Sequence, residues 1–265
     1  MDNLFQFDML KNIKEITHCY TTRLGGVSKD AFASLNMGFN RGDAYENVIE
    51  NYQRVTKTLG LSIEKLVLSD QVHKDAVMEI NEEHLGMGIC RESTIKNIDG
   101  MVTNKPNIGL TTFYADCVPL FFYDPIHKAI ALSHSGWRGT VKKIGLKTLE
   151  TMQRKYKTQA KDVLIGIGPA IGKCCYQVSE DVKKEFDLSF NDDIIGKIVF
   201  PSHDDSTKYM LDLKMANLCM FEQAGVKSSN IEVSSLCTSC HDDLFFSHRR
   251  MGTSRGSQVA IFALR

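Results

Sequence analysis

Short apolar runs alternate with helical patterns along the whole chain. Runs rich in β-branched and aromatic residues predict strands at residues 14–21, 66–68, 77–80, 99–103, 108–114, 121–125, 129–133, 162–168, 231–233 and 258–264. Apolar residues spaced three and four apart predict helices after residues 43, 140 and 212, and a shorter helix is expected after residue 179. Because strands and helices are mixed from end to end, without a repeat or a linker, the sequence predicts one α/β-type domain over residues 1–265.

Two of the predicted helices carry signals at their starts. Asp43 is placed to cap the helix that follows it, and Glu46, three residues later, would complete a capping box. Thr140 is placed to cap the next helix in the same way. Residues 191–208 are polar, and the sequence assigns no element to them.

Composition and charge narrow the classes of partner. Hydrophobic residues make up 43% of the chain, which is ordinary for a globular protein, and 32 Lys and Arg balance 32 Asp and Glu. Without a basic stripe, nucleic acid and anionic membranes are not expected as main partners. No apolar run is long enough to span a bilayer, and Met1–Phe5 does not begin a signal-peptide pattern, so we expect a cytoplasmic protein.

The cysteines allow more than one interpretation. Eight of them occur in the chain, and a reducing compartment favours free thiols over disulfides. Cys237 and Cys240 form a C-x-x-C motif followed by His241, which is a possible metal or redox site. One such motif without a second pair is weak, so ordinary packed or exposed cysteines remain the favoured interpretation.

A second set of metal-type residues is scattered along the chain. His73, Cys117 and His134 each stand at the end of a predicted strand, and two neighbouring strands can bring Cys117 close to His134. One thiolate and two imidazoles suit Zn²⁺ with an open fourth position, and they also bind copper. Alternatively, Cys117 and His134 form a nucleophilic dyad oriented by Asp99 or Asp116. A multicopper site is disfavoured because the eight histidines include no His-x-His pair.

Two arginines beside glycines are candidate anion ligands. Arg23 lies in the glycine-containing segment Thr22–Ser28, and Arg138 lies just before the helix predicted after Thr140. The N-terminus of that helix would favour an anion such as phosphate near His134. Trp137, the only tryptophan, could stack on a purine or belong to the core.

Taken together, these segments resemble the laccase-domain family. This family carries the older name multicopper polyphenol oxidase and is also called peptidoglycan editing factor or purine nucleoside phosphorylase. The matching motifs, in order, are Thr22-Arg23-x-Gly25-Gly26-Val27-Ser28, Ser34-Leu35-Asn36-x-Gly38, Gly42-Asp43, Gln71-Val72-His73, Asp99-Gly100, Ala115-Asp116-Cys117-x-Pro119, His134-Ser135-Gly136-Trp137-Arg138-Gly139, Gly168-Pro169-x-Ile171, Cys175-Tyr176, Asp212-Leu213, Phe245-Phe246-Ser247 and Arg249-Arg250. The C-terminal Gly-Thr-x-Gly-Arg motif of the family is one residue shorter here, so Arg255 is assigned no role.

The resemblance implies both a fold and a chemistry. It implies a four-layer α/β/β/α sandwich with mixed sheets, and a zinc site made by His73, Cys117 and His134, with copper as the alternative metal. It also implies phosphorolysis of adenosine, inosine and 5′-methylthioadenosine, together with deamination of adenosine. The expected partners are therefore purine nucleosides and phosphate, and a monomer is expected.

Roles for individual side chains follow from this chemistry as hypotheses. We expect Arg23 or Arg138 to hold the phosphate, and Asn36 and Gln71 to bond the ribose or the edges of the base. Deamination also needs a group that transfers protons, and Asp116 is the acid nearest to the motif cysteine.

Overall fold

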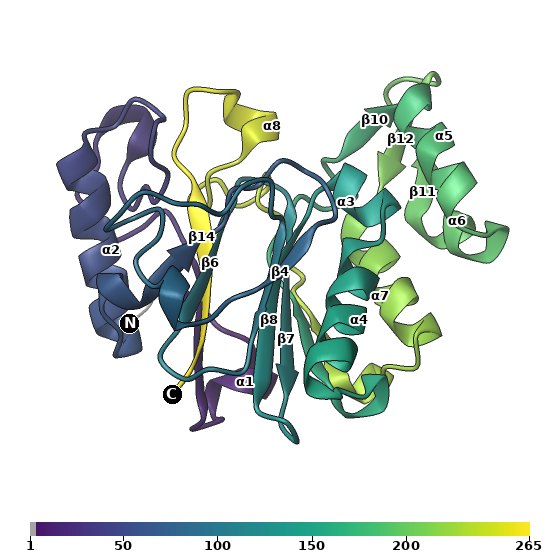
Figure 1. The fold of residues 1–265 in the computed structure, drawn as a ribbon. Coiled ribbons are helices and arrows are strands. Elements are labelled where there is room, and N and C mark those ends of the chain that lie inside the picture. Colours follow the sequence, from purple (N-terminus) through teal and green to yellow (C-terminus); the bar gives the residue numbers. More distant parts are fainter. Residues whose placement is uncertain (1–3) are drawn as a thin grey trace.

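Two mixed β-sheets pack face to face in the computed structural model, which describes residues 4–265, and helices cover their outer faces (Figure 1). The first sheet contains, in spatial order, β1 (Leu4–Phe5), β2 (Ile16–Thr21), β14 (Gln258–Leu264), β6 (Gly109–Tyr114) and β3 (Leu66–Leu68). The second sheet contains β13 (Ile231–Val233), β9 (Leu164–Ile167), β7 (Val118–Asp124), β8 (Ala129–Ser135), β5 (Gly100–Thr103) and β4 (Val77–Glu79).

Both sheets combine antiparallel and parallel pairs. In the first sheet β14 is antiparallel to β2 and β6, whereas β3 is parallel to β6. In the second sheet β7 is antiparallel to β8 and β9, whereas β13 and β4 pair in parallel at the two edges. The mixed α/β class predicted from the sequence is therefore confirmed.

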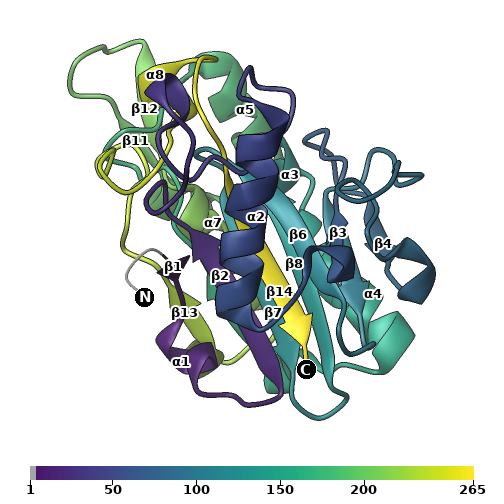
Figure 2. The ribbon, with the colours of Figure 1, turned by 90° about the vertical axis from the view of Figure 1, so that its left-hand side faces the viewer.

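The outer layers are made by helices. α2 (Tyr45–Leu59) lies across the first sheet, as the side view shows (Figure 2). α4 (Ile144–Tyr156) and α7 (Leu213–Gln223) cover the second sheet on the opposite side of the molecule (Figure 1). The resulting order of helix, sheet, sheet and helix is the four-layer sandwich that the resemblance implies.

The central strands are buried on both faces, which explains their continuous apolar runs. On β7, Leu120 and Phe122 pack under the helices α4 and α7, whereas Phe121 faces the other sheet. On β14, Phe262 faces the space between the sheets and Ile261 faces α2. The apolar residues form three cores, one between the two sheets and one under the helices on each outer face. Because successive side chains of a strand point to opposite faces, β7 and β14 each contribute to two of these cores.

The start of α2 differs from the prediction. Its N-cap residue is Ala44, and no side chain caps the helix. The carboxylate of Asp43 instead accepts hydrogen bonds from the Asn36 side chain (3.0 Å), the Asn47 side chain (3.0 Å) and the Ala44 backbone. The predicted capping box with Glu46 is therefore wrong, because Asp43 ties the preceding loop to the helix.

The helix predicted after Thr140 is also different. A short helix, α3 (Trp137–Val141), contains Thr140, and α4 begins only after Lys143, which adopts a left-handed conformation (φ 61°). The Thr140 hydroxyl donates to the Gly136 carbonyl at 3.0 Å. Thr140 is thus inside a helical turn and does not cap the longer helix.

The polar segment 191–208, to which the sequence assigns no element, contains a helix and strands. A third, antiparallel sheet is formed by β10 (Gln177–Ser179), β12 (Lys208–Leu211) and β11 (Val199–Pro201). With α5 (Glu180–Ser189) and α6 (Asp192–Ile198) it projects from one end of the molecule (Figure 1). The remaining short elements are α1 (Asp8–Lys11), α8 (His248–Met251) and 3-10 turns at Asp30–Phe32, Ile63–Lys65, Glu82–His84, Ala160–Asp162 and Ser228–Asn230. None of the helices in the described part of the chain has both the length and the apolar character of a membrane span.

Candidate metal centre

Three donor side chains meet at one end of the two sheets. The ligand atoms of His73, Cys117 and His134 all lie within 4.8 Å of one another. His73 belongs to the loop after β3, Cys117 lies where the chain crosses from β6 to β7, and His134 is near the end of β8. The structure therefore brings together the three residues that the sequence singles out.

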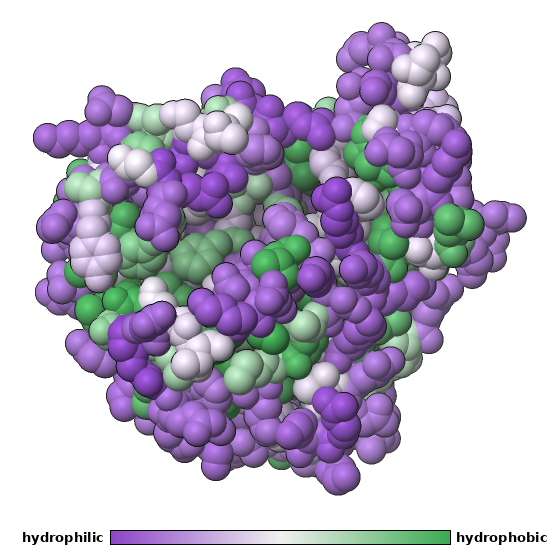
Figure 3. Space-filling model, turned by 45° about the horizontal axis from the view of Figure 1, so that its top comes forward, coloured by the Kyte–Doolittle hydropathy of each residue, from purple (hydrophilic) through white to green (hydrophobic). Residues whose placement is uncertain are grey.

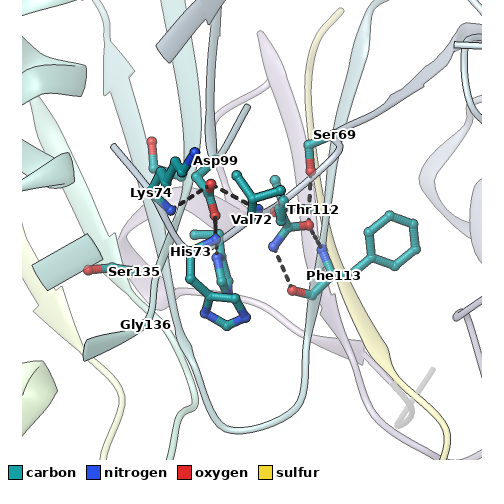
Figure 4. A network of polar contacts seen from close by, with 12 residues as sticks. Ser69, Val72, His73, Lys74, Asp99, Thr112, Phe113, Ser135 and Gly136 are labelled. Atoms are coloured by element: carbon teal, nitrogen blue, oxygen red, sulfur yellow. Dashed lines mark hydrogen bonds and ion pairs between the residues drawn. The ribbon is translucent and has the colours of Figure 1, made fainter. Parts of the chain in front are cut away.

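Asp99 organises this centre from behind. Its carboxylate accepts hydrogen bonds from the backbone N–H groups of Val72 (3.0 Å), His73 (3.0 Å) and Lys74 (2.9 Å), as Figure 4 shows. The same carboxylate bonds Nδ1 of His134 at 2.9 Å, which leaves Nε2 of that ring for a metal ion. One buried side chain thus sets the His73 loop and the orientation of His134.

The loop that Asp99 holds has an unusual backbone. His73 adopts a left-handed conformation with φ 57°, which is uncommon for a residue other than glycine. The three hydrogen bonds to Asp99 surround this residue and compensate for the conformation. Although burial opposes ionisation of Asp99, hydrogen bonds from His134 and the backbone lower the pKa of its carboxyl group, so Asp99 is an anion at neutral pH.

Gly136 lets the side chains of His73 and Cys117 lie against the backbone that follows His134. A Cβ atom at this position would lie 2.9 Å from Nδ1 of His73 and 3.0 Å from Sγ of Cys117. Both distances are shorter than ordinary van der Waals contacts, so any larger residue would push two donor atoms away. The His-Ser-Gly motif therefore combines a ligand with the space that the other two ligands need.

Cys117 and His134 shift each other's pKa. Burial alone would raise the pKa of Cys117, but the charge of His134 and hydrogen bonds from His134 and His73 outweigh it and lower the pKa from 9.0 to about 6. Burial alone would lower the pKa of His134, but the charge of Cys117 and the hydrogen bond to Asp99 raise it to about 9. Without a metal ion the two groups form a thiolate–imidazolium pair at neutral pH.

The donor set fits a metal ion. The rings of His73 and His134 lie with their centroids 4.7 Å apart and their planes at 72°, so both can direct a nitrogen toward one point. One sulfur and two nitrogens are typical zinc ligands, and three protein ligands leave a fourth position for water or substrate. The carboxylate behind His134 is the partner that metal-bound histidines ordinarily have.

A cavity opens beside the three donors. Its volume is about 400 Å³, within the range of small-molecule sites. Figure 3 shows this end of the molecule, where apolar side chains lie in a recess ringed by hydrophilic ones. The lining includes all three donors, the apolar residues Phe39, Leu68, Ile95 and Phe113, and the cations Arg41, Lys96 and Arg255.

Arg255 is a site residue that the sequence reasoning missed. It lines the cavity and is only 7% exposed, yet its Nε has no hydrogen-bond partner in the described structure. Burial is the main cause that lowers the pKa of Arg255, and the nearby charge of Arg41 adds to the effect. The signal in the sequence was the arginine of the family's C-terminal motif, which the one-residue difference in spacing obscured.

Gln71 lines the cavity, but most of its amide is already engaged. Its oxygen accepts hydrogen bonds from the Phe113 backbone (2.7 Å) and the Ser69 hydroxyl (2.9 Å), and its nitrogen donates to the Phe113 carbonyl (2.9 Å). These bonds connect the loop after β3 to the end of β6; the partners Ser69 and Phe113 are labelled in Figure 4. One of its two amide hydrogens has no partner among the described residues.

The other predicted substrate ligands lie away from the cavity lining. Asn36 is fully buried, and its amide bonds the loop carbonyl of Gly38 and the Asp43 carboxylate. Arg23 donates to the carbonyls of Ala33 (2.9 Å) and Asp242 (2.7 Å). The guanidinium of Arg138 stacks on Trp137, 4.2 Å from the ring centroid, and neither residue lines the cavity beside the donors.

Asp116 also serves a structural contact. Its Oδ1 accepts a hydrogen bond from the Thr238 hydroxyl at 2.6 Å, and its Oδ2 accepts one from the Arg249 backbone at 2.7 Å. Asp116 is buried and does not line the cavity, so Asp99 is the carboxylate that orients His134.

Comparisons with known proteins agree with these features. A family profile described as multi-copper polyphenol oxidoreductase laccase matches residues 17–265. The purine nucleoside phosphorylase YlmD of Bacillus subtilis is 33% identical over 257 residues, covering 96% of this chain and 91% of that protein. Its namesake from Geobacillus stearothermophilus is 36% identical over 247 residues, covering 92% and 89%.

Solved structures show the same architecture. The crystal structure of the hypothetical protein YfiH from Bacillus licheniformis is similar with a TM-score of 0.93 and 32% identity, covering 100% of this chain and 97% of that chain. The crystal structure of YlmD from Geobacillus stearothermophilus has a TM-score of 0.88 and covers 95% and 93%. The chain therefore belongs to the family described as multi-copper polyphenol oxidoreductase laccase.

Proposed function

We propose that this chain is a zinc-dependent purine nucleoside phosphorylase that cleaves adenosine, inosine and 5′-methylthioadenosine with phosphate. The observation that carries the proposal is one cavity that is lined by both a His-Cys-His donor set and a buried arginine, Arg255. Relatives that match more than nine-tenths of the chain bear the name purine nucleoside phosphorylase, which supports the same reaction.

His73, Cys117 and His134 would hold the zinc ion. When bound with three protein ligands, zinc acts as a Lewis acid and lowers the pKa of a coordinated water. The chain's own contribution is to fix the donors, because Asp99 orients His134 and Gly136 leaves room for the other two. Zinc is preferred over copper because the sequence contains no His-x-His pair, although the same donors bind copper.

Phosphate would bind at the cationic wall of the cavity. Phosphorolysis places a phosphate oxygen at the anomeric carbon while the glycosidic bond loosens toward an oxocarbenium ion. Arg41 and Arg255 supply the positive charge for a phosphate at this wall, and Nη1 of Arg255 is held in place by a hydrogen bond to the Gly256 carbonyl (2.8 Å). Because Arg255 is buried and lines the cavity, its charge is poorly solvated, and a bound anion would offset it. This assigns to Arg41 and Arg255 the role that the sequence suggested for Arg23 and Arg138.

The purine would occupy the apolar wall. Phe39 and Phe113 provide aromatic surface, and Leu68 and Ile95 extend it. Gln71 remains the candidate for a polar contact to the base or ribose, through the amide hydrogen that has no protein partner. Such a site, mostly apolar with a few placed polar groups, is typical for small ligands.

Deamination of adenosine is proposed as an accompanying reaction. It needs a group that moves a proton to the leaving nitrogen. Asp70 is the one carboxylate among the described residues that line the cavity, and it accepts a hydrogen bond from the Asn97 backbone at 2.9 Å. We therefore assign the proton transfer to Asp70 in place of Asp116, whose two carboxylate oxygens are both engaged.

A metal-free hydrolase is the second candidate. The lowered pKa of Cys117 and the raised pKa of His134 describe the thiolate–imidazolium pair that cysteine nucleophiles use. In that case the Cys117 thiolate would attack an acyl carbon, the leaving group would depart with the proton of the His134 imidazolium, and water would then hydrolyse the thioester. Chelators would not inhibit such an enzyme.

The deciding experiment combines metal analysis with a product assay. Purified protein is analysed for zinc and copper and incubated with adenosine and phosphate, and the products are separated by chromatography. We expect zinc and adenine with the unaltered protein, whereas Cys117→Ala should form no adenine and bind less zinc. Cys90→Ala is the matched control, because Cys90 is outside the donor set, and it should retain both.

The same assay separates the proposed reactions. Asp70→Asn should abolish inosine formation from adenosine while adenine formation continues. Several copper ions per chain, or activity on acyl substrates without metal, would replace the proposal by one of the alternatives. The absence of adenine and inosine with fully metal-loaded protein would refute it.

A further inference from the structure

Four cysteines from two distant segments form a second cluster of possible metal ligands. The Sγ atoms of Cys174, Cys175, Cys237 and Cys240 all lie within 4.8 Å of one another. Cys240 is 3.5 Å from Cys174 and 3.4 Å from Cys175, measured between Sγ atoms. The second thiol pair that the C-x-x-C motif lacked in the sequence is therefore supplied by the adjacent Cys174 and Cys175.

The spacing matches a tetrahedral thiolate site. A zinc ion with four sulfurs at about 2.3 Å separates the sulfurs by about 3.8 Å. A disulfide, by contrast, requires sulfurs about 2.05 Å apart. A disulfide would also draw Cys240 to one partner, whereas its sulfur is nearly equidistant from Cys174 and Cys175.

The two cysteine segments are held together by other contacts. Ala170 and Cys237 form a parallel bridge, and the Thr238 backbone donates to the Ala170 carbonyl at 3.1 Å. The Gly172 N–H donates to Sγ of Cys237 at 3.2 Å, a contact that stabilises negative charge on sulfur. Backbone contacts between the two segments therefore hold the four thiols close to one another.

Three cationic side chains bond the backbone of the cysteine segments or of the residues next to them. The ammonium of Lys214, a buried residue, donates to the carbonyls of Ser234 (2.6 Å) and Leu236 (3.0 Å), just before Cys237. Arg249 donates to the Cys175 carbonyl at 3.2 Å, and Arg250 donates to the Ser239 carbonyl at 3.3 Å. A zinc ion with four thiolates carries two excess negative charges, and Lys214 and Arg249 offset part of this charge, whereas Arg250 is paired with Asp242 at 2.8 Å.

We propose that Cys174, Cys175, Cys237 and Cys240 bind a second metal ion, a zinc ion in a closed four-sulfur structural site. Four protein ligands leave no open position, so this ion would stabilise the fold and take no part in chemistry. Both cysteine segments contact Asp116, through the Ile171 backbone (2.9 Å) and the Thr238 hydroxyl (2.6 Å). Since Asp116 precedes Cys117, the second ion would fix the loop that carries a ligand of the first centre.

Metal counting with site-specific variants tests the proposal. Full-length protein is loaded with zinc, freed of excess by gel filtration and analysed for zinc per chain. We expect the Cys174→Ser/Cys240→Ser variant and the Cys117→Ser variant each to keep about half of the zinc of the unaltered protein. Cys90→Ser, at an exposed cysteine outside both clusters, should keep all of it.

A second measurement serves if the double variant fails to fold. Cobalt-loaded Cys117→Ser protein should show the sulfur-to-cobalt absorption of a tetrathiolate site, and zinc should protect all four cysteines of the unaltered protein from alkylation. Zinc that is lost completely in Cys117→Ser would overturn the proposal. Disulfides among the four cysteines in freshly purified protein, found by mass before and after reduction, would also overturn it. The test does not depend on enzymatic activity.

Discussion

At the scale of single residues, Asp99 connects two of the three segments that supply metal ligands. It bonds His134 and three consecutive backbone N–H groups around His73. Asp99→Asn replaces an acceptor oxygen by a donor amide, so two of these contacts become repulsive. We expect zinc affinity to fall about 10–100-fold. Competition with a chromogenic chelator measures the affinity, and an unchanged value would contradict the role of Asp99.

The thiolate–imidazolium pair predicts a pH dependence. Alkylation requires the thiolate, so the rate at Cys117 in metal-free protein should rise with pH through a midpoint of about 6. In His134→Gln the main attraction that lowers this pKa is lost, so burial should raise the midpoint, while His73 continues to oppose the rise. Mass spectrometry of the Cys117 peptide after short exposure to iodoacetamide gives the rates.

A matched thiol is present in the same protein. Burial and the charge of Glu64 raise the pKa of Cys90, so alkylation there should have a midpoint above 9.0 in both proteins. A midpoint near 9.0 at Cys117 in the unaltered protein would show that the pair is not formed.

Arg255 is the residue through which phosphate binding can be tested. Arg255→Met removes the buried guanidinium, and we expect kcat/KM for phosphate to fall by about 100-fold. Arg154→Met, at an exposed arginine of α4, is the control and should leave the constant nearly unchanged. Equal effects of the two substitutions would refute a phosphate site at Arg255.

At the scale of elements, the turn between β8 and α3 is the most constrained. Gly136 approaches two ligands so closely that Gly136→Ala should displace them and reduce bound zinc. Gly196→Ala in α6 is the matched control, because a Cβ there meets nothing within 4 Å. The control should increase the free energy of unfolding by about 0.5–1 kcal/mol, since alanine favours helix. Zinc content and thermal unfolding of both variants provide the comparison.

The elements also show where local signals succeed. The helix predicted after residue 212 is present as α7: Asp212 caps it, accepting a hydrogen bond from the Met215 backbone at 3.0 Å, and Gly225 follows it with φ 85°. Asp43 and Thr140 have the same residue types as a cap but make other contacts. A capping signal is therefore informative only where the side chain has no stronger partner elsewhere in the fold.

At the scale of the whole molecule, the packing of the two sheets brings together the segments that supply the metal ligands. Phe121 lies in this space and is fully buried, 5.5 Å from Phe262 between ring centroids. Phe121→Ala should reduce the free energy of unfolding by about 3–5 kcal/mol, because it leaves a cavity. Leu188→Ala, at a side chain that is 84% exposed, should change it by less than about 0.5 kcal/mol. Denaturant unfolding measures both, and similar values would contradict the packing described.

Several properties of this protein follow from its sequence by itself. The central strands, α2, α7 and the family motifs are visible because periodicity and residue type are local properties. The metal-type residues His73, Cys117 and His134 can be selected because few other residue types supply such donors, and the structure brings them together.

Only the tertiary structure decided which polar groups surround those donors. Asp116 and Thr238 are 122 positions apart in sequence, and Cys174 and Cys240 are 66 apart, yet each pair is in contact. Side-chain direction and long-range contact depend on how strands pack, so residue type alone could not separate Arg255 from Arg23, or Asp99 from Asp116. The sequence thus determined which chemical groups were available, and the packing of the two sheets determined which of them face the cavity.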